Sequence, residues 1–265
     1  MTAARSEALV RRLAALRPLA PEQLFRLRGM LAGDEIAAVY NSNAIEGNTL
    51  TLGETALVIE HGLTVAGKPL KDHLEAIDLF EALKYIEEIA RDPSALSERT
   101  LKEIHALVLR RSDPGAAGRY RDIPVTIGGT TYVPPLPLFV SERMEGVFAR
   151  YVARHEREHP IVVAAELHQG IVDVHPFEDG NGRTARLAMN LHLLQRGYPL
   201  TIIEYERRER YLSALRAAQS GEDPAAFIEF LTERVETSLE RYLRAIEIPY
   251  SGKRPPPERK LEDRS

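Results

Sequence analysis

The chain has 265 residues, 44% of them hydrophobic, and a formal net charge of −4. This length can bury a sizeable core, and a nearly balanced charge with arginines interspersed among acids argues against a polynucleotide partner. The chain has no cysteine, which excludes disulfides and thiolate metal sites. It also has no run of eighteen apolar residues, which argues against membrane-spanning helices. We therefore expect a cytoplasmic protein.

Residues 1–34 are expected to form an N-terminal helical extension. Their first stretch is an amphipathic pattern that Glu7, Arg11 and Arg12 interrupt, so it lacks the apolar core of a signal peptide. The chain beyond them is predicted to be mostly helices joined by short breaks.

The next helix is predicted over about residues 36–46, with apolar Val39 and Ile45 on one side. Gly47 follows directly and is typical of a C-terminal helix break. Taken alone, Glu46 at this helix end would be a solvated charge.

Three helices are predicted in the stretch that follows. Residues 51–54 (Thr-Leu-Gly-Glu) form a capping box that opens a helix to His61, with Gly62 as its stop. A second helix is predicted over about 71–90. Ser97 has the side chain to cap the third, which continues through the apolar positions of the next ten residues.

Residues 124–133 carry the only convincing strand signal in the chain. Two β-type runs, 125–127 and 130–133, flank the pair Gly128-Gly129 and predict a short hairpin. The pattern alone leaves open a surface hairpin without a role.

After Val140, four or five further helices are predicted, the last ending near Ile248. One of them covers the apolar run that starts at Ile161 and ends near His175, where Pro176 stops it. The length and apolar character of this run predict a buried helix.

The triplet 180–182 (Gly-Asn-Gly) stands at the N-terminus of the next helix, in which Leu187, Leu191 and Leu194 recur at helical spacing. Glycine lets the backbone approach a ligand closely, and the first N–H groups of a helix have no internal acceptor. This segment therefore predicts a cradle for an anion.

The charges around the cradle indicate a polyphosphate. Arg183 and Arg186 are three apart on the helix, so we expect them to share a face over the cradle and to offer planar forks to phosphate oxygens. Asp179 would repel a bare phosphate, which indicates an intervening cation such as Mg²⁺. His175, with an unperturbed pKa of about 6.5, is the natural general base. A nucleotide with Mg²⁺ is the simplest ligand that uses every charge.

The stretch HPFEDGNGRTAR, residues 175–186, resembles the signature of the Fic family, HPFx(D/E)GNGRxxR, at every fixed position. The resemblance extends over about residues 35–235. It implies an all-α, Fic-type helical domain with one hairpin flap, and an enzyme that transfers AMP from ATP to a Ser, Thr or Tyr hydroxyl of a target protein.

The resemblance also implies residue roles. It makes His175 the base that deprotonates the acceptor hydroxyl, Asp179 the Mg²⁺ ligand and Phe177 a core anchor of the loop. The residues that would bind the nucleotide are Gly180, Asn181 and Gly182 in the anion hole, Arg183 on the β-phosphate and Arg186 on the γ-phosphate. Tyr211 lies where Fic domains place part of the adenine pocket, although its position on an amphipathic helix also fits simple packing.

Residues 42–47 match the pattern (S/T)xxxE(G/N) of the inhibitory helix that many Fic proteins carry. Because the pattern precedes the motif in the same chain, the resemblance implies an N-terminal, intramolecular inhibitor that involves Ser42 and Glu46. Glu46 would pair with Arg186 and compete with the γ-phosphate for its guanidinium. By the same resemblance, Glu46 could position a water that removes AMP from a modified protein.

The hairpin at 124–133 corresponds to a flap that docks the target backbone by strand pairing in Fic proteins. The resemblance therefore assigns target docking to Thr126, Ile127, Thr130 and Thr131. A homodimer is left open.

The expected division is an extension over 1–34, a Fic domain over 35–250 and a disordered, proline-rich tail over 251–265. Two alternatives to AMP transfer stay open, namely a non-catalytic nucleotide-binding regulator and the transfer of UMP or phosphocholine. Gly182 argues against phosphate transfer, because relatives that move phosphate have lysine there.

Overall fold

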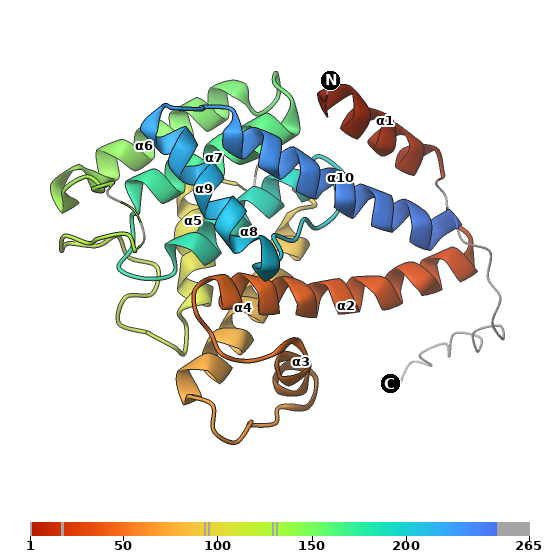
Figure 1. The fold of residues 1–265 in the computed structure, drawn as a ribbon, viewed down its shortest axis with the longest axis horizontal. Coiled ribbons are helices and arrows are strands. Elements are labelled where there is room, and N and C mark those ends of the chain that lie inside the picture. Colours follow the sequence, from red (N-terminus) through yellow and green to blue (C-terminus); the bar gives the residue numbers. More distant parts are fainter. Residues whose placement is uncertain are drawn as a thin grey trace, which may run out of the picture.

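Helices make up the described part of the fold (Figure 1). The computed structural model describes residues 2–16, 19–92, 94, 96–128, 130 and 132–247. Within them lie ten α-helices, two short 3-10 helices and no strand, which confirms the predicted all-α class. The elements are α1 (Thr2–Ala15), α2 (Pro21–Ile45), α3 (Leu52–His61), α4 (Leu70–Ile89), α5 (Glu98–Val108), η1 (Pro137–Phe139), α6 (Val140–Arg154), α7 (Pro160–Val174), α8 (Asn181–Gln195), η2 (Tyr205–Arg207), α9 (Arg208–Ser220) and α10 (Ala226–Glu247).

The ends of several helices lie where the sequence predicts them. The Thr51 side chain accepts the Glu54 N–H, and the Glu54 carboxylate accepts the Thr51 N–H at 2.7 Å, so the capping box is formed. Gly62 ends α3 with φ 64°, a left-handed conformation that suits glycine. Ser97 caps α5 through the Thr100 N–H at 3.2 Å.

The core has two apolar clusters that meet at α7 and α8 in the centre of the molecule (Figure 1). One cluster joins these two helices to α4, α5 and α6, and the other joins them to α1, α9 and α10. Helix α8 is buried over almost its full length. Its N-terminus and the loop before it are therefore held from both sides by packed helices.

Helix α2 leads the chain into the centre from the N-terminal side (Figure 1). It runs unbroken from Pro21 to Ile45, so the predicted boundary after residue 34 falls inside it. Helix α1 is fastened to α10 by ion pairs, among them Arg12 with Glu247 at 2.5 Å. The division into domains stays a prediction, and the tail 251–265 lies outside the described residues.

The predicted hairpin at 124–133 is wrong for the described residues of that segment. They form an open loop with a turn at Gly128, while Gly129 and Thr131 lie outside the described part. A hairpin that pairs with no third strand is marginal in water, and here the prolines on both sides remove backbone donors. The strand propensity of this segment correctly indicated extended backbone, but the two runs do not pair as strands.

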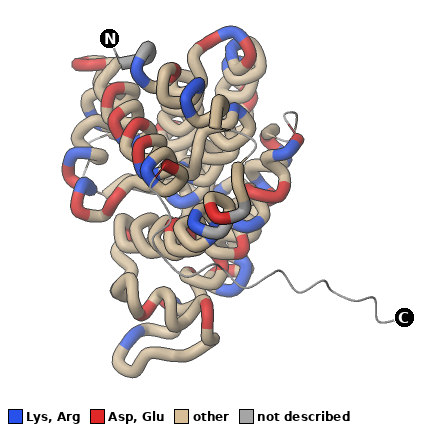
Figure 2. Tube along the Cα trace, turned by 90° about the vertical axis from the view of Figure 1, so that its right-hand side faces the viewer, with Lys and Arg blue, Asp and Glu red and all other residues tan. Residues whose placement is uncertain are grey.

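Positively and negatively charged residues are interspersed along the described part of the trace (Figure 2). This mixture agrees with the interspersed charges of the sequence. Among the described residues, no helix combines the length and the apolar character needed to cross a bilayer.

Candidate functional site

The loop between α7 and α8 is built around His175, the C-terminal cap of α7. His175 has φ 49°, and it is the one non-glycine residue with positive φ in the described chain. A side chain in this left-handed region is strained, and such strain concentrates at functional sites. The turn directs the chain away from α7 and brings Gly180, with φ 75°, to the N-cap of α8.

Asn181 closes the loop rather than pointing toward a ligand. Its side-chain amide accepts the Phe177 N–H and donates to the Phe177 carbonyl, both at 2.9 Å. The residue is buried. Of the three residues expected in the anion hole, Asn181 therefore offers its backbone, and its side chain sets the shape of the loop.

Phe177 anchors the same loop in the hydrophobic core. It is fully buried and stacks on the imidazole of His105, with ring centroids 3.6 Å apart. His105 Nδ1 accepts the Gly118 N–H, so its Nε2 donates to the Asp179 carbonyl at 2.9 Å. Burial lowers the pKa of His105 to about 4 and keeps it neutral for this role.

Replacing Phe177 by Ala is expected to lower the free energy of unfolding by about 3–5 kcal/mol, because it removes a packed ring and leaves a cavity. It should also weaken binding of ATP, the ligand expected from the sequence. Urea unfolding and calorimetry measure the two effects. Phe148→Ala, a core change on α6, should cost stability alone, and unchanged ATP binding in folded Phe177→Ala would contradict the anchoring role.

Arg121 holds the loop 124–133 next to the backbone of His175. Its buried guanidinium donates to the carbonyls of His175 at 2.8 Å, Ile123 at 3.0 Å and Pro135 at 2.6 Å. The two ends of the loop and the histidine backbone are therefore held by one side chain. The sequence offered no signal for this, since a lone arginine in a loop usually faces water.

The imidazole of His175 is suited to accept a proton. Its Nδ1 lies 3.4 Å from the Val172 carbonyl oxygen, so Nδ1 is the donor in the neutral ring and Nε2 is free to act as a base. Burial lowers the pKa of His175 below its ordinary value, which keeps the ring neutral near pH 7.

Asp179 lies at the centre of a charged network on the α4 side of the loop. Its carboxylate accepts the Gly180 N–H at 2.6 Å and contacts Arg183 at 3.2 Å and Lys71 at 3.5 Å. Burial raises the pKa of Asp179, but Arg183 and the Gly180 N–H outweigh it, so the pKa lies below its usual range. The carboxylate is charged and 45% exposed, and Lys71 already brings a cation to it.

Arg183 does not face the same space as Arg186, contrary to the expectation from their spacing. Its side chain is 1% exposed and contacts Glu75 at 3.1 Å as well as Asp179. Glu75 in turn accepts from the side chain of Asn48 at 2.9 Å. In this state Arg183 belongs to the Asp179 network.

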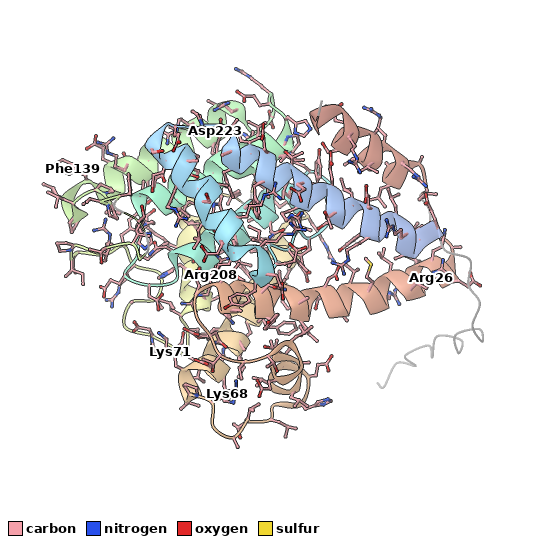
Figure 3. All side chains as sticks on the ribbon, viewed as in Figure 1. Arg26, Lys68, Lys71, Phe139, Arg208 and Asp223 are labelled. Carbon is pink, nitrogen blue, oxygen red and sulfur yellow. The ribbon has the colours of Figure 1, made fainter. Side chains whose placement is uncertain are left out.

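Arg186 and Glu46 meet as the resemblance implies. The guanidinium donates to Glu46 Oε1 at 2.8 Å, to the Ser42 carbonyl at 2.8 Å and to Ser42 Oγ at 2.9 Å. Burial would lower the pKa of Arg186, but Glu46 and Tyr211 raise it above its ordinary value. The end of α2 is also held by Arg208, which donates to the Ile45 carbonyl at 2.9 Å (Figure 3).

The Glu46 carboxylate lies at the place where the sequence predicts the anion cradle. A Cβ placed on Gly182 would collide with Glu46 Oε1 and would lie 3.0 Å from the Arg186 guanidinium. The carboxylate thus lies directly above the first turn of α8, where unpaired N–H groups and the helix dipole favour an anion.

Part of the motif faces one pocket of about 580 Å³, a size typical of small-molecule sites. It is lined by residues that include Glu46, Thr126, Ile127, His175, Gly182, Arg186 and Tyr211. Asp179 and Arg183 are not among them. Thr130 and Tyr132 line a separate hollow of about 820 Å³ against the end of α9, which contains none of the motif residues.

Several residues of the site were missed in the sequence. Four residues contact the motif from segments 54 to 108 residues earlier in the chain, as the numbering of their partners His175, Asp179 and Arg183 shows; they are His105, Arg121, Lys71 and Glu75. Each is an isolated polar residue whose role depends on its partner. Only an arrangement in space, or a resemblance that includes these positions, could have identified them.

Comparison with known proteins places this geometry in a wider group. Residues 95–193 match the Fic/DOC family. The chain is 38% identical over 213 residues to the protein adenylyltransferase Fic of Nematostella vectensis, which covers 79% of this chain and 49% of that relative. It is 35% identical over 223 residues to the protein adenylyltransferase fic-1 of Caenorhabditis elegans, covering 83% of this chain and 43% of the other. The chain thus spans less than half the length of these curated relatives.

Two solved structures have the same fold. A Fic domain containing signaling protein from Bacteroides thetaiotaomicron superposes with a TM-score of 0.82 at 30% identity, covering 92% of this chain and 97% of the other. Fic-1 from C. elegans superposes with a TM-score of 0.79 at 33% identity, covering 92% and 71%. The fold similarity therefore extends well beyond the matched motif.

Proposed function

Because the chain belongs to the Fic/DOC family, we propose that it is a protein adenylyltransferase that moves AMP from ATP to a hydroxyl group of a target protein. The curated relatives carry that name. The observation that carries the proposal is a single pocket in which the imidazole of His175, the N-terminus of α8 and the guanidinium of Arg186 meet.

The reaction needs a base, an anion site and an open path to the acceptor. The acceptor oxygen attacks the α-phosphorus of ATP, and His175 Nε2 takes the hydroxyl proton. The bond from the α-phosphorus to the bridging oxygen breaks, and pyrophosphate leaves with that electron pair. The N–H groups at the start of α8 stabilise the phosphate charge, while Arg186 binds the terminal phosphate.

Mg²⁺ fits the Asp179 end of the site. The carboxylate is charged, half-exposed and already next to a cation, Lys71. Within the described chain no group of three or more His, Asp or Glu side chains could hold a metal by itself. One carboxylate plus phosphate oxygens and water is a usual way to bind Mg²⁺, which would neutralise charge on the polyphosphate.

Lys71 competes with Mg²⁺ for Asp179 under this proposal. Lys71→Met is expected to lower the Mg²⁺ concentration that half-saturates ATP binding by about two- to fivefold, a small effect because the ammonium is largely exposed. Calorimetric titration of ATP at graded Mg²⁺ measures it.

Lys84→Met is the matched control for Lys71→Met, since Lys84 pairs with Glu35 and Glu87 rather than with the motif. It should leave the Mg²⁺ dependence unchanged. A weaker Mg²⁺ response in Lys71→Met would mean that the lysine helps to bind the polyphosphate instead of opposing the metal.

Autoinhibition by Glu46 is part of the proposal. The carboxylate contacts Arg186 and lies in the anion cradle, so it opposes a triphosphate both by position and by charge. Glu46 also lines the same pocket as His175, which supports a second use of this carboxylate in positioning a water that removes AMP from a modified target.

Target docking is assigned to the loop beside the pocket. Thr126 and Ile127 line the pocket, and Arg121 holds both ends of the loop at the backbone of His175. Extended chain with free backbone groups can pair with a strand of another protein. A target segment bound there would present its hydroxyl next to the imidazole.

The most informative experiment incubates the Glu46→Gly chain with labelled ATP, GTP, CTP or UTP in host lysate and identifies labelled proteins by mass spectrometry. We expect AMP on Ser, Thr or Tyr of a small set of proteins. Labelling by UTP alone would replace AMP by UMP as the transferred group. Nucleotide binding without any labelling would favour a non-catalytic regulator.

A further inference from the structure

Behind Arg186 lies a buried pair of polar side chains that the reaction above does not use. The Tyr211 hydroxyl is 3.4 Å from Arg186 Nη1 and 3.0 Å from His168 Nε2. His168 is fully buried and Tyr211 is 2% exposed. The Tyr211 hydroxyl and His168 Nε2 are paired with each other, whereas His168 Nδ1 is buried and has no hydrogen-bond partner among the described residues.

The direction of the hydrogen bond between Arg186 and Tyr211 follows from the chemistry of the guanidinium. A guanidinium only donates, so the Tyr211 oxygen accepts from Arg186, and its second contact is the hydrogen bond with His168 Nε2, in which the donor depends on the tautomer of the imidazole. In either neutral tautomer the hydrogen bond with Nε2 fixes the position of the Tyr211 oxygen. Burial lowers the pKa of His168 to about 3, with Arg186 adding to the effect, so the ring is neutral near pH 7.

The pair comes from a different part of the fold than the other partners of Arg186. Ser42 lies in α2 and Glu46 is the residue that caps its C-terminus, so both leave together if the end of α2 moves. His168 and Tyr211 belong to α7 and α9. Their contact with Arg186 does not depend on the inhibitory helix.

We propose that His168 and Tyr211 are positioning residues that hold Arg186 ready for the terminal phosphate once Glu46 withdraws. The inference rests on the proposed function, since it takes Arg186 as the ligand of the γ-phosphate. His168 orients the Tyr211 hydroxyl, and the hydroxyl oxygen holds one guanidinium nitrogen. A guanidinium held in place loses less conformational freedom when ATP binds.

The molecule contains a matched control for this pair. Tyr151 and His192 form a second buried Tyr–His hydrogen bond, at 3.1 Å, between α6 and α8. The environment of His192 resembles that of His168, because burial lowers the pKa of His192 to about 3 as well. This pair does not line the pocket of Arg186.

The test measures ATP and ADP affinity by calorimetry in Glu46→Gly protein. Tyr211→Phe keeps the ring and removes the hydroxyl, and we expect about 10-fold weaker ATP binding with little change for ADP, because only ATP has the phosphate that Arg186 binds. His168→Leu should do the same, and the two changes together should cost no more than either alone. His168→Gln, which can offer an acceptor oxygen, should restore part of the affinity.

Tyr151→Phe is expected to leave both affinities unchanged. Additive losses for Tyr211→Phe and His168→Leu, or equal losses for ATP and ADP, would overturn the positioning role. Should His168→Leu fail to fold, Tyr211→Phe and His168→Gln still decide the question. If Glu46→Gly itself binds no nucleotide, the proposed function fails instead, so the two failures are distinct.

Discussion

Glu46→Gly is expected to transfer AMP at least about 10-fold, and up to about 100-fold, faster than the unmodified chain. The estimate follows from one charge-assisted hydrogen bond, which contributes about 1.5–3 kcal/mol when it is buried. Arg186 is almost completely buried and donates to Glu46 at 2.8 Å, while the Glu46 side chain is 39% exposed, so the bond is partly buried and the lower part of this range applies.

The position of the carboxylate adds to this effect. Glu46 lies over Gly182 at the N-terminus of α8, the place proposed for a phosphate of the nucleotide. A negative charge there repels the triphosphate as well as engaging its arginine. Glycine at position 46 removes both obstacles, while the left-handed Gly47 still ends α2.

Initial rates with labelled ATP and an acceptor protein measure the gain. Glu209→Ala is a matched control, because Glu209 is another carboxylate at the pocket that pairs with Arg208 and not with Arg186. It should leave the rate low. Equal rates for Glu46→Gly and the unmodified chain would remove autoinhibition from the proposal, and loss of AMP release from a modified target in Glu46→Gly would support the second role of the carboxylate.

Short-range chemistry made much of the fold predictable. The capping box at Thr51, the Ser97 cap and the glycine stops at Gly47 and Gly62 involve neighbours in sequence, and all are found. The apolar run before His175 and the glycines after it likewise fixed the two central helices. These features depend on backbone hydrogen bonds within one turn, so they need no knowledge of the rest of the molecule.

The features that could not be predicted depend on contacts between residues that are far apart in the sequence. Helical spacing placed Arg183 and Arg186 on one face, but Glu75 and Asp179 draw Arg183 aside, while Ser42 and Tyr211 hold Arg186. The contact of Glu46 with Arg186 joins residues 140 apart and was expected from resemblance, not from spacing. The hairpin predicted at 124–133 was wrong because strand propensity does not show whether a neighbouring strand is present to pair with.

Removal of the general base should have the largest effect of all. His175→Ala, made in the Glu46→Gly protein, is expected to lower the rate of AMP transfer by about 10² to 10⁴ with ATP affinity unchanged, because general-base catalysis contributes that much and the imidazole does not bind phosphate. Initial rates and calorimetry separate these two quantities. A comparable loss of ATP affinity would instead make His175 a binding residue.

The left-handed backbone of His175 calls for a second variant. Asparagine tolerates this conformation and cannot act as a base, so His175→Asn should be as inactive as His175→Ala and keep the melting temperature. His61→Ala, an exposed histidine at the end of α3, should be fully active. An active His175→Asn protein would exclude proton transfer to this side chain.

The pH dependence gives an independent check on the same group. The base works in its neutral form, so the rate falls as the pH drops through the pKa of His175. Burial lowers that pKa below the ordinary value of about 6.5, and the acid limb of the Glu46→Gly profile should therefore lie below pH 6.5. A limb at or above this value would mean that His175 is not desolvated in the working enzyme or that another group titrates.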